Sequence, residues 1–231
     1  MSLNNTGYSI PEMRENCVHF LDSNCRFVSA QVPLETPPVV PILGLYVDCH
    51  EEGTVFYQPV LSEVIYCIKN KEVYPYYTYH NRSDYKMLSG KEKETLVFDG
   101  YGRSKDLSEK WKRDYIVPWG NILVTDNYVY NIFQGKEDVH LFYDKKTGKS
   151  IVFDWDKLSK EGNFSTLFLN HIHCAKGDVF YSVPSSYWLH KVLNSIDNMP
   201  DGKLKKYLQN MEIDDNPFIL SFKIKIPEDT E

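Results

Sequence analysis

Alanine is nearly absent from this chain of 231 residues, since it occurs only at Ala30 and Ala175. Alanine is the strongest helix former, whereas tyrosine and phenylalanine favour the half-buried, pleated surface of a sheet. The chain has 17 tyrosines and 12 phenylalanines. This composition predicts an all-β fold and argues against a parallel α/β fold, which would need several long helices.

The chain also lacks an excess of basic residues, because 26 Lys and Arg stand against 32 Asp and Glu and give a net charge of −6. A nucleic-acid surface needs a concentrated basic face, so we expect no nucleic-acid partner. No apolar run approaches the ~20 residues of a membrane-spanning helix, and we expect no membrane span. The content of 42% hydrophobic residues excludes an intrinsically disordered chain.

No pair of cysteines has the CxxC spacing of a zinc knuckle or a thioredoxin-type motif. Five cysteines leave at least one unpaired, and we interpret all five as structural free thiols. A disulfide between Cys17 and Cys25 is the alternative, because a hairpin through Asp22–Asn24 would bring the two near each other. The sequence does not test that geometry.

Short alternating segments separated by turn residues run along most of the chain. They predict a first hairpin over 16–32 and strands over 43–47, 54–57, 63–68, 73–79, 115–117, 122–125, 128–133, 139–143, 151–155, 167–172, 179–183 and 218–225. Four strands in ~40 residues is the spacing of a propeller blade or a sandwich. The segment Asp144–Gly148 is a strong hairpin turn, because glycine adopts positive φ without strain.

Helices are predicted only over 104–112, 186–197 and 202–211. Leu189, Val192, Leu193 and Ile196 fall at i, i+3, i+4 and i+7, which is one apolar helical face. Ser185 or Ser186 is expected to cap this helix, and Asp201 the following one, because a side-chain oxygen at that position accepts from the first free backbone N–H groups.

The final segments carry a resemblance to a known family. A helix, the turn Asp214-Asp215-Asn216-Pro217 and the alternating strand Phe218–Lys225 resemble the C-terminus of the six-bladed β-propeller proteins of the Bacteroidetes. Glu63–Tyr66 followed by Val73–Tyr77 looks like a blade edge of that family, and Asp144–Ser150 looks like a blade hairpin. The chain departs from the pattern at Ser221-Phe222, where family members often carry an aliphatic–tyrosine pair.

The resemblance implies a β-propeller or partial propeller with short helical insertions near the C-terminus. At ~40–45 residues per blade, 231 residues supply about four blades, fewer than a six-bladed ring needs. Residues 1–8 are interpreted as a tag-derived or disordered N-terminus, and 9–231 as a single propeller-like domain or a fragment of a longer propeller. Family members are mostly predicted periplasmic or surface lipoproteins, so the resemblance implies the cell envelope, with the leader absent from this chain.

No catalytic, cofactor-binding or metal-binding residue is predicted. His171 and His173 would share one face of a strand, but no third metal ligand accompanies them. The acidic residues around Asp154 do not follow the calcium-loop spacing. Tyr101 lies in a glycine-rich segment, 99–102, that lacks both a dinucleotide spacing and a phosphate-loop lysine. The candidate ligand surface therefore consists of four residues: Trp119, Tyr101, His171 and His173.

The tyrosines at 74, 76, 77 and 79 form a dense cluster with two interpretations. Exposed rings stack on sugars or grip peptides, whereas buried rings fill the space between twisted sheets. We favour the second interpretation, because buried aromatics dominate the energetics of protein cores.

The function predicted from these features is a non-catalytic binding or scaffold module that is exported and binds a glycan, a peptide or a partner protein. The alternative is a propeller hydrolase that acts on a carbohydrate or a lactone at its central channel, and a third reading is a structural fragment whose activity resides in further blades. If the propeller is an open arc, its apolar blade face predicts a homo-oligomer.

The predicted apolar stripe of 186–197 generates a test. Leu193→Asp should lower the free energy of unfolding by about 3 kcal/mol, because the change buries an unpaired charge. Thermal or urea denaturation measures the loss. An unchanged midpoint would mean that the stripe faces solvent.

Overall fold

The structure is a computed structural model of the chain, and it describes residues 11–33, 47–50, 53–59, 61–80, 85–96, 105–106, 109, 115–136, 138–169, 172–193, 196, 199–212 and 217–226. The chain divides into two compact units. Unit 1 comprises residues 1–122 and 132–136, and unit 2 comprises residues 123–131 and 137–231. Strands β7 and β8 contribute residues to both units.

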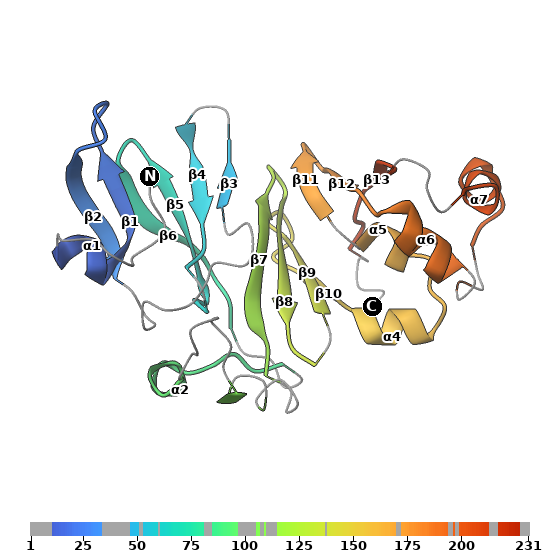
Figure 1. Cartoon of the computed structure of the whole chain (residues 1–231), viewed down its shortest axis with the longest axis horizontal. Coiled ribbons are helices and arrows are strands. Elements are labelled where there is room, and N and C mark those ends of the chain that lie inside the picture. Colours follow the sequence, from blue (N-terminus) through green and yellow to red (C-terminus); the bar gives the residue numbers. More distant parts are fainter. Residues whose placement is uncertain are drawn as a thin grey trace. The chain divides into compact units, whose positions relative to one another are not determined.

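The described residues form a mostly β structure with several antiparallel sheets and short helices (Figure 1). The first part of the chain contains α1 (Pro11–Glu15), β1 (Asn16–Leu21), β2 (Phe27–Pro33), β3 (Val47–Cys49), β4 (Val55–Tyr57), β5 (Val64–Lys69), β6 (Glu72–Thr78) and α2 (Gly90–Glu94). The next sheet consists of β7 (Val117–Val124), β8 (Tyr128–Gln134), β9 (Asp138–Asp144) and β10 (Ser150–Asp154). The last part contains α4 (Trp155–Lys160), α5 (Thr166–Leu169), β11 (Ile172–Lys176), β12 (Val179–Ser182), α6 (Ser186–Leu193), α7 (Lys203–Gln209) and β13 (Leu220–Phe222).

Two four-stranded sheets follow the chain in simple order. One has the order β3-β4-β5-β6 and the other the order β10-β9-β8-β7, so each strand lies beside its neighbours in sequence. The remaining strands form the pair β1-β2 and the three-stranded sheet β11-β12-β13. This organisation confirms the predicted mostly β class. The described residues display no closed ring of sheets, so the propeller arrangement itself stays a prediction.

The predicted first hairpin is present in unit 1 and packs on the sheet β3-β4-β5-β6. Cys17, Val18 and Val32 of the hairpin share one apolar cluster with Tyr57 and Ile68 of the sheet. Val18 has no exposed surface. Burial of a Val or Ile side chain contributes about 1.5–3 kcal/mol, so this cluster accounts for the attachment of the hairpin to the sheet.

The cysteines of the hairpin are free thiols, and Cys17 and Cys25 form no disulfide. Asn16 lies opposite Pro33 in the register, which places Cys17 at the open end of the hairpin. Cys25 lies in the turn at the other end, where its backbone N–H donates to the carbonyl of Asp22. The two cysteines are therefore separated along the length of the hairpin, which a disulfide does not tolerate.

An ion pair connects helix α2 to Glu63, the residue that precedes β5. Ser89 and Glu92 form a capping box at the N-terminus of α2, and Leu88 and Leu96 on either side of the helix pack on Leu61. Lys93 is only 2% exposed. Its ammonium group donates a hydrogen bond to the carboxylate of Glu63. Burial opposes the charge of Glu63, yet the hydrogen bond from Lys93 leaves the pKa of Glu63 below its ordinary value.

Two prolines lie inside strands, and both strands are at sheet edges. Pro75 lies in β6 and Pro118 in β7, each the last strand of its sheet. An edge strand tolerates the missing N–H, because that side of the strand has no partner to receive it. The prediction of two separate strands at 115–117 and 122–125 was therefore wrong, because β7 continues through Pro118 as one strand. Asn121 within this strand has a positive φ of 57°.

Other boundaries also differ from the prediction. The strand predicted over 167–172 begins instead as helix α5, and β11 starts only at Ile172. The strand predicted to include Trp155 ends at Asp154, whose side chain accepts from the backbone N–H of Lys157 and caps α4. Of the helix predicted over 104–112, only residues 105–106 and 109 are described.

The ion pair between the buried Lys93 and the partly exposed Glu63 generates a test. Glu63→Ala should lower the free energy of unfolding by about 1–3 kcal/mol, because it leaves the buried ammonium group of Lys93 without this carboxylate. Urea denaturation measures the change. Asp201→Ala removes the exposed pair with Lys205 and should have no measurable effect, as is usual for surface pairs. Equal stability of both variants would contradict the structural role of the buried pair.

Candidate functional site

Helices α6 and α7 cover an apolar core in unit 2. Leu189 of α6, Leu208 of α7 and Leu220 of β13 are buried in one cluster with Leu167 and Met211. The stripe predicted on α6 is confirmed, because Val192, Leu193 and Ile196 pack against the same cluster. Ser185 caps α6 as expected, since its hydroxyl accepts from the backbone N–H of Trp188 at 3.3 Å.

The predicted cap of the second helix was wrong. Gly202 occupies the N-cap of α7, and no side chain makes a capping bond there. Asp201 instead accepts from Nζ of Lys205 at 2.7 Å, one helical turn further along. This hydrogen bond lowers the pKa of the Asp201 carboxyl.

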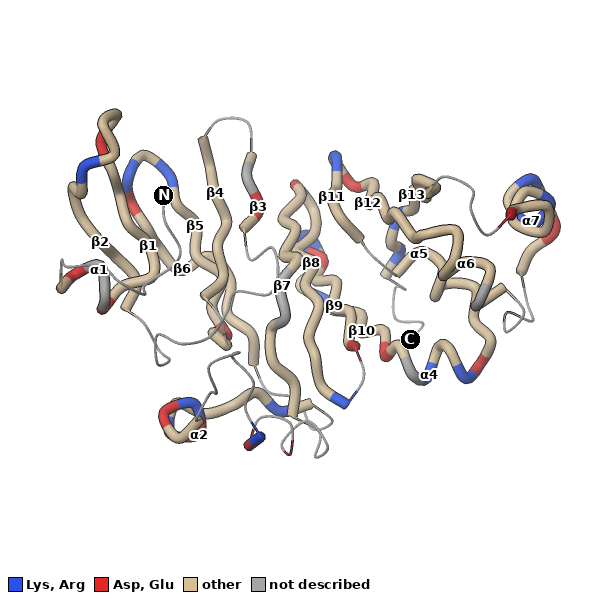
Figure 2. Tube along the Cα trace, viewed as in Figure 1, with Lys and Arg blue, Asp and Glu red and all other residues tan. Residues whose placement is uncertain are grey.

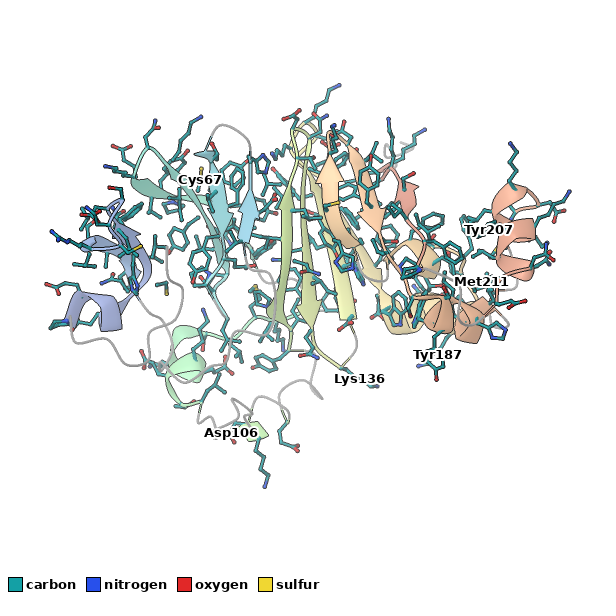
Figure 3. The ribbon with its side chains drawn as sticks, turned by 45° about the horizontal axis from the view of Figure 1, so that its top comes forward. Cys67, Asp106, Lys136, Tyr187, Tyr207 and Met211 are labelled. Atoms are coloured by element: carbon teal, nitrogen blue, oxygen red, sulfur yellow. The ribbon has the colours of Figure 1, made fainter. Side chains whose placement is uncertain are left out.

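A pocket of about 260 Å³ lies where α6 and α7 meet. Its apolar lining is made by residues of both helices and of the link between them: Leu193, Ile196, Met199, Leu208 and Met211. The label of Met211 in Figure 3 marks the end of α7 on the side of α6. Methionine is unbranched and polarisable, so two methionines give this lining an adaptable shape.

The rim of the pocket is polar. It consists of His190, Lys205 and Gln209, which bring an imidazole, an ammonium group and an amide to the edge of an apolar interior. Figure 2 shows basic and acidic residues along α7. An apolar interior with a few polar groups at its edge is the usual composition of a ligand site.

The four residues of the predicted ligand surface are not brought together by the part of the chain that the structure describes. Tyr101 and His171 lie outside the described residues. Trp119 lies on β7, the edge strand of its sheet, and its side chain is not described. His173 lies exposed on β11, next to a register shift between Ile172 and Cys174. The use of these residues in binding stays a prediction.

The sequence predicted both helices of the pocket, over 186–197 and 202–211, but it gave no separate indication of a pocket between them. The apolar residues at helical spacing in 202–211 were Leu204, Leu208 and Met211, and this pattern is the same for a packed face and for a pocket wall. The available signal was the pair of methionines, Met199 and Met211, on either side of α7. Methionine is frequent at binding surfaces that adapt to their ligands.

The dense tyrosine cluster is divided by the sheet into buried and exposed rings. Tyr79 is 6% exposed, and its ring packs edge-on against Phe133 with centroids 4.9 Å apart. Tyr74 and Tyr76 are 44% and 37% exposed. The core interpretation is confirmed for Tyr79, whereas the use of the exposed rings in binding stays a prediction.

A buried tyrosine–histidine pair lies on the adjacent strands β8 and β9. The hydroxyl of Tyr130 is 3.0 Å from Nδ1 of His140, and the two residues are 1% and 2% exposed. Burial lowers the pKa of His140 to about 4 and raises that of Tyr130. The imidazole is therefore neutral and the phenol protonated, and the tautomer of His140 decides which of the two groups donates the hydrogen bond. Because both groups are enclosed, the pair serves to satisfy polar atoms in the core rather than to act on a substrate.

Within the described ranges, no group of three or more His, Cys, Asp or Glu side chains lies close enough to hold a metal ion. None of the described helices is long and apolar enough to cross a membrane.

The chain shares its fold with a protein of known structure. No protein-family model and no curated protein sequence matches the chain. The chain is similar in fold to a crystal structure from Bacteroides fragilis, of a protein described as exported by prediction, with a TM-score of 0.70 and 17% sequence identity. The match covers 96% of this chain and 62% of that protein, so this chain spans less than two thirds of its relative.

The neutral buried histidine generates a pH-dependent prediction. His140 takes up a proton in the unfolded chain near pH 6.5 but in the folded protein only near pH 4. Its contribution to stability is therefore present above pH ~6.5 and is lost as the pH falls, by about 3 kcal/mol at pH ~4.

Urea denaturation between pH 7 and pH 4.5 measures this loss. His140→Gln removes the titrating group and should lose less stability over the same range, because the carboxylates contribute alike to both proteins. Identical pH profiles of the two proteins would contradict the assignment of a neutral His140.

Proposed function

We propose that the chain is a non-catalytic binding protein of propeller type, exported to the cell envelope, that holds an apolar side chain of a peptide or protein partner in the pocket of α6 and α7. The observation that carries the proposal is the open, methionine-containing pocket with its polar rim. The Bacteroides fragilis protein, whose fold this chain shares, is described as exported by prediction, and this supports the compartment.

The propeller arrangement is supported by strand order. Four strands that each lie beside their neighbours in sequence make up a propeller blade, and β3–β6 and β7–β10 both follow this order. The sheet β11-β12-β13 has the same order with three strands. In this proposal, residues 9–231 form one propeller-like domain, and the helices α6 and α7 are an insertion between the second and third strands of a blade.

The size of the pocket limits its ligand. Pockets for drug-sized molecules begin at ~300 Å³, so about 260 Å³ accommodates one bulky apolar group rather than an extended ligand. The imidazole, ammonium and amide groups of the rim are placed to meet the polar backbone on either side of that group. This combination matches a leucine, phenylalanine or methionine side chain of a peptide.

Methionine methyl groups provide a direct test. In protein labelled with ¹³C at the methionine methyl groups, the Met199 and Met211 signals should shift on titration with acetylated, amidated leucine, phenylalanine or methionine. The signal of Met87, which is buried in unit 1, should not move.

The control variants separate the pocket from general adsorption. Ile196→Trp fills the pocket and should abolish the shifts, whereas Tyr187→Ala alters an exposed ring of α6 that does not line the pocket and should leave them unchanged. Absent shifts at Met199 and Met211, or equal shifts at Met87, would contradict the proposal.

A further inference from the structure

A row of side chains crosses the sheet β3-β4-β5-β6 on one face. The register pairs Asp48 with Phe56, Phe56 with Cys67 and Cys67 with Tyr74. Residues paired directly across antiparallel strands project from the same face. The opposite face, which carries Tyr57 and Ile68, packs on the hairpin β1-β2. This row therefore lies on the face that the hairpin does not cover.

Aromatic rings extend along this face. The ring of Phe56 contacts the ring of Tyr76 with centroids 4.7 Å apart, and the ring of His50 with centroids 5.1 Å apart. Phe56 and Cys67 are 7% and 2% exposed, whereas Tyr74 and Tyr76 are 44% and 37% exposed. The two tyrosines thus form an accessible surface above a buried floor, and Figure 3 labels Cys67 within this sheet.

Tyr76 lies on the same face as Tyr74, because it follows Tyr74 by two residues in β6. Its ring contacts the ring of Phe56 on that face. Ile65 pairs with Tyr77 and Tyr66 with Pro75, so Tyr76 is also the additional residue of a β-bulge.

A ligand that adds a strand to the edge of the sheet is not favoured next to Tyr74 and Tyr76. β6 is the edge strand of its sheet, but Pro75 lies between the two tyrosines and supplies no N–H for a further strand. A ligand at this location is therefore expected to contact the face of the sheet rather than its edge.

Polar groups complete the surface at β3. The carboxylate of Asp48 and Nε2 of His50 lie 3.0 Å apart, and the His50 ring rests against Phe56. The same face also carries Lys69 and Glu72, which pair across β5 and β6 next to Cys67 and Tyr74. With Asp48, this face therefore has two carboxylates and one ammonium group, and no excess of positive charge. Figure 2 shows β4 without charged residues and the charges of β5 and β6 near their ends.

We infer that this face of the sheet β3-β4-β5-β6 is a second binding surface, and that its ligand is a neutral oligosaccharide. The C–H face of a pyranose ring is apolar and packs flat on an exposed aromatic ring such as Tyr74 or Tyr76. Its hydroxyl groups both donate and accept, which suits the phenol hydroxyls and the Asp48–His50 pair. An anionic sugar would meet two carboxylates, Asp48 and Glu72, against the single ammonium group of Lys69, which favours a neutral ligand. The inference is independent of the pocket in unit 2.

Isothermal titration calorimetry with the full chain tests the inference. The probes are the neutral hexasaccharides cellohexaose, laminarihexaose and mannohexaose, with hexagalacturonate as the anionic comparison. At least one neutral probe should bind, and the double variant Tyr74→Ala/Tyr76→Ala should weaken it about tenfold or more, as expected for the loss of two stacking rings. Tyr74→Phe/Tyr76→Phe keeps the rings and should retain most of the affinity.

Matched controls come from unit 2. Tyr187 and Tyr207 are 64% and 58% exposed, so Tyr187→Ala/Tyr207→Ala removes two rings that are more accessible than Tyr74 and Tyr76 and should not change binding. Ile196→Trp, which fills the pocket, should also leave it unchanged. If the alanine variant of Tyr74 and Tyr76 loses its cooperative unfolding, His50→Ala provides the second readout and should weaken the same probe.

The inference is overturned if no neutral probe binds, if only hexagalacturonate binds, or if the control tyrosines matter as much as Tyr74 and Tyr76. Binding of a peptide in place of a saccharide to this face, measured by the same variants, would also overturn it.

Discussion

The contacts of one buried ring, Phe180, hold unit 2 together. Phe180 has no exposed surface, and its ring meets the rings of Tyr128, Tyr130, Phe142 and Phe222 with centroids 5.1 to 6.1 Å apart. These rings come from β8, β9 and β13, so a single side chain of β12 links two sheets. Edge-to-face and offset contacts of this kind contribute about 0.5–1.5 kcal/mol each beyond the burial of area. A core filled by large rings explains why the chain has so little need for alanine.

The helices and the pocket depend on that sheet in turn. Leu220 of β13 is buried against residues of α6 and α7, so the apolar face of the last strand is covered within the unit. The predicted homo-oligomer stays a prediction. The apolar faces of α6 and α7 do not fill the space between them completely. The remaining volume is the pocket.

Unit 1 uses the same aromatic composition with a different result. The hairpin β1-β2 covers one face of the sheet β3-β4-β5-β6, and Tyr79 is buried against Phe133. Tyr74 and Tyr76, on the edge strand β6, stay accessible at 44% and 37% exposed. Rings that fill a core in one place thus form a surface in another, and sequence composition does not separate the two uses.

Strand positions followed from alternation and turn chemistry: the Asp144 side chain accepts from the N–H of Lys146, and Gly148 has a φ of 72°. The α6 stripe followed from helical spacing. Tertiary context decided what local pattern could not. Pro118 continues a strand because β7 is an edge, and Asp154 stops a strand because its side chain caps α4. Exposed and buried tyrosines, pocket and packed core all have the same local sequence pattern. The physical reason is that period and propensity depend on neighbours in sequence, whereas burial depends on which residues meet across strands and helices that are distant in the chain.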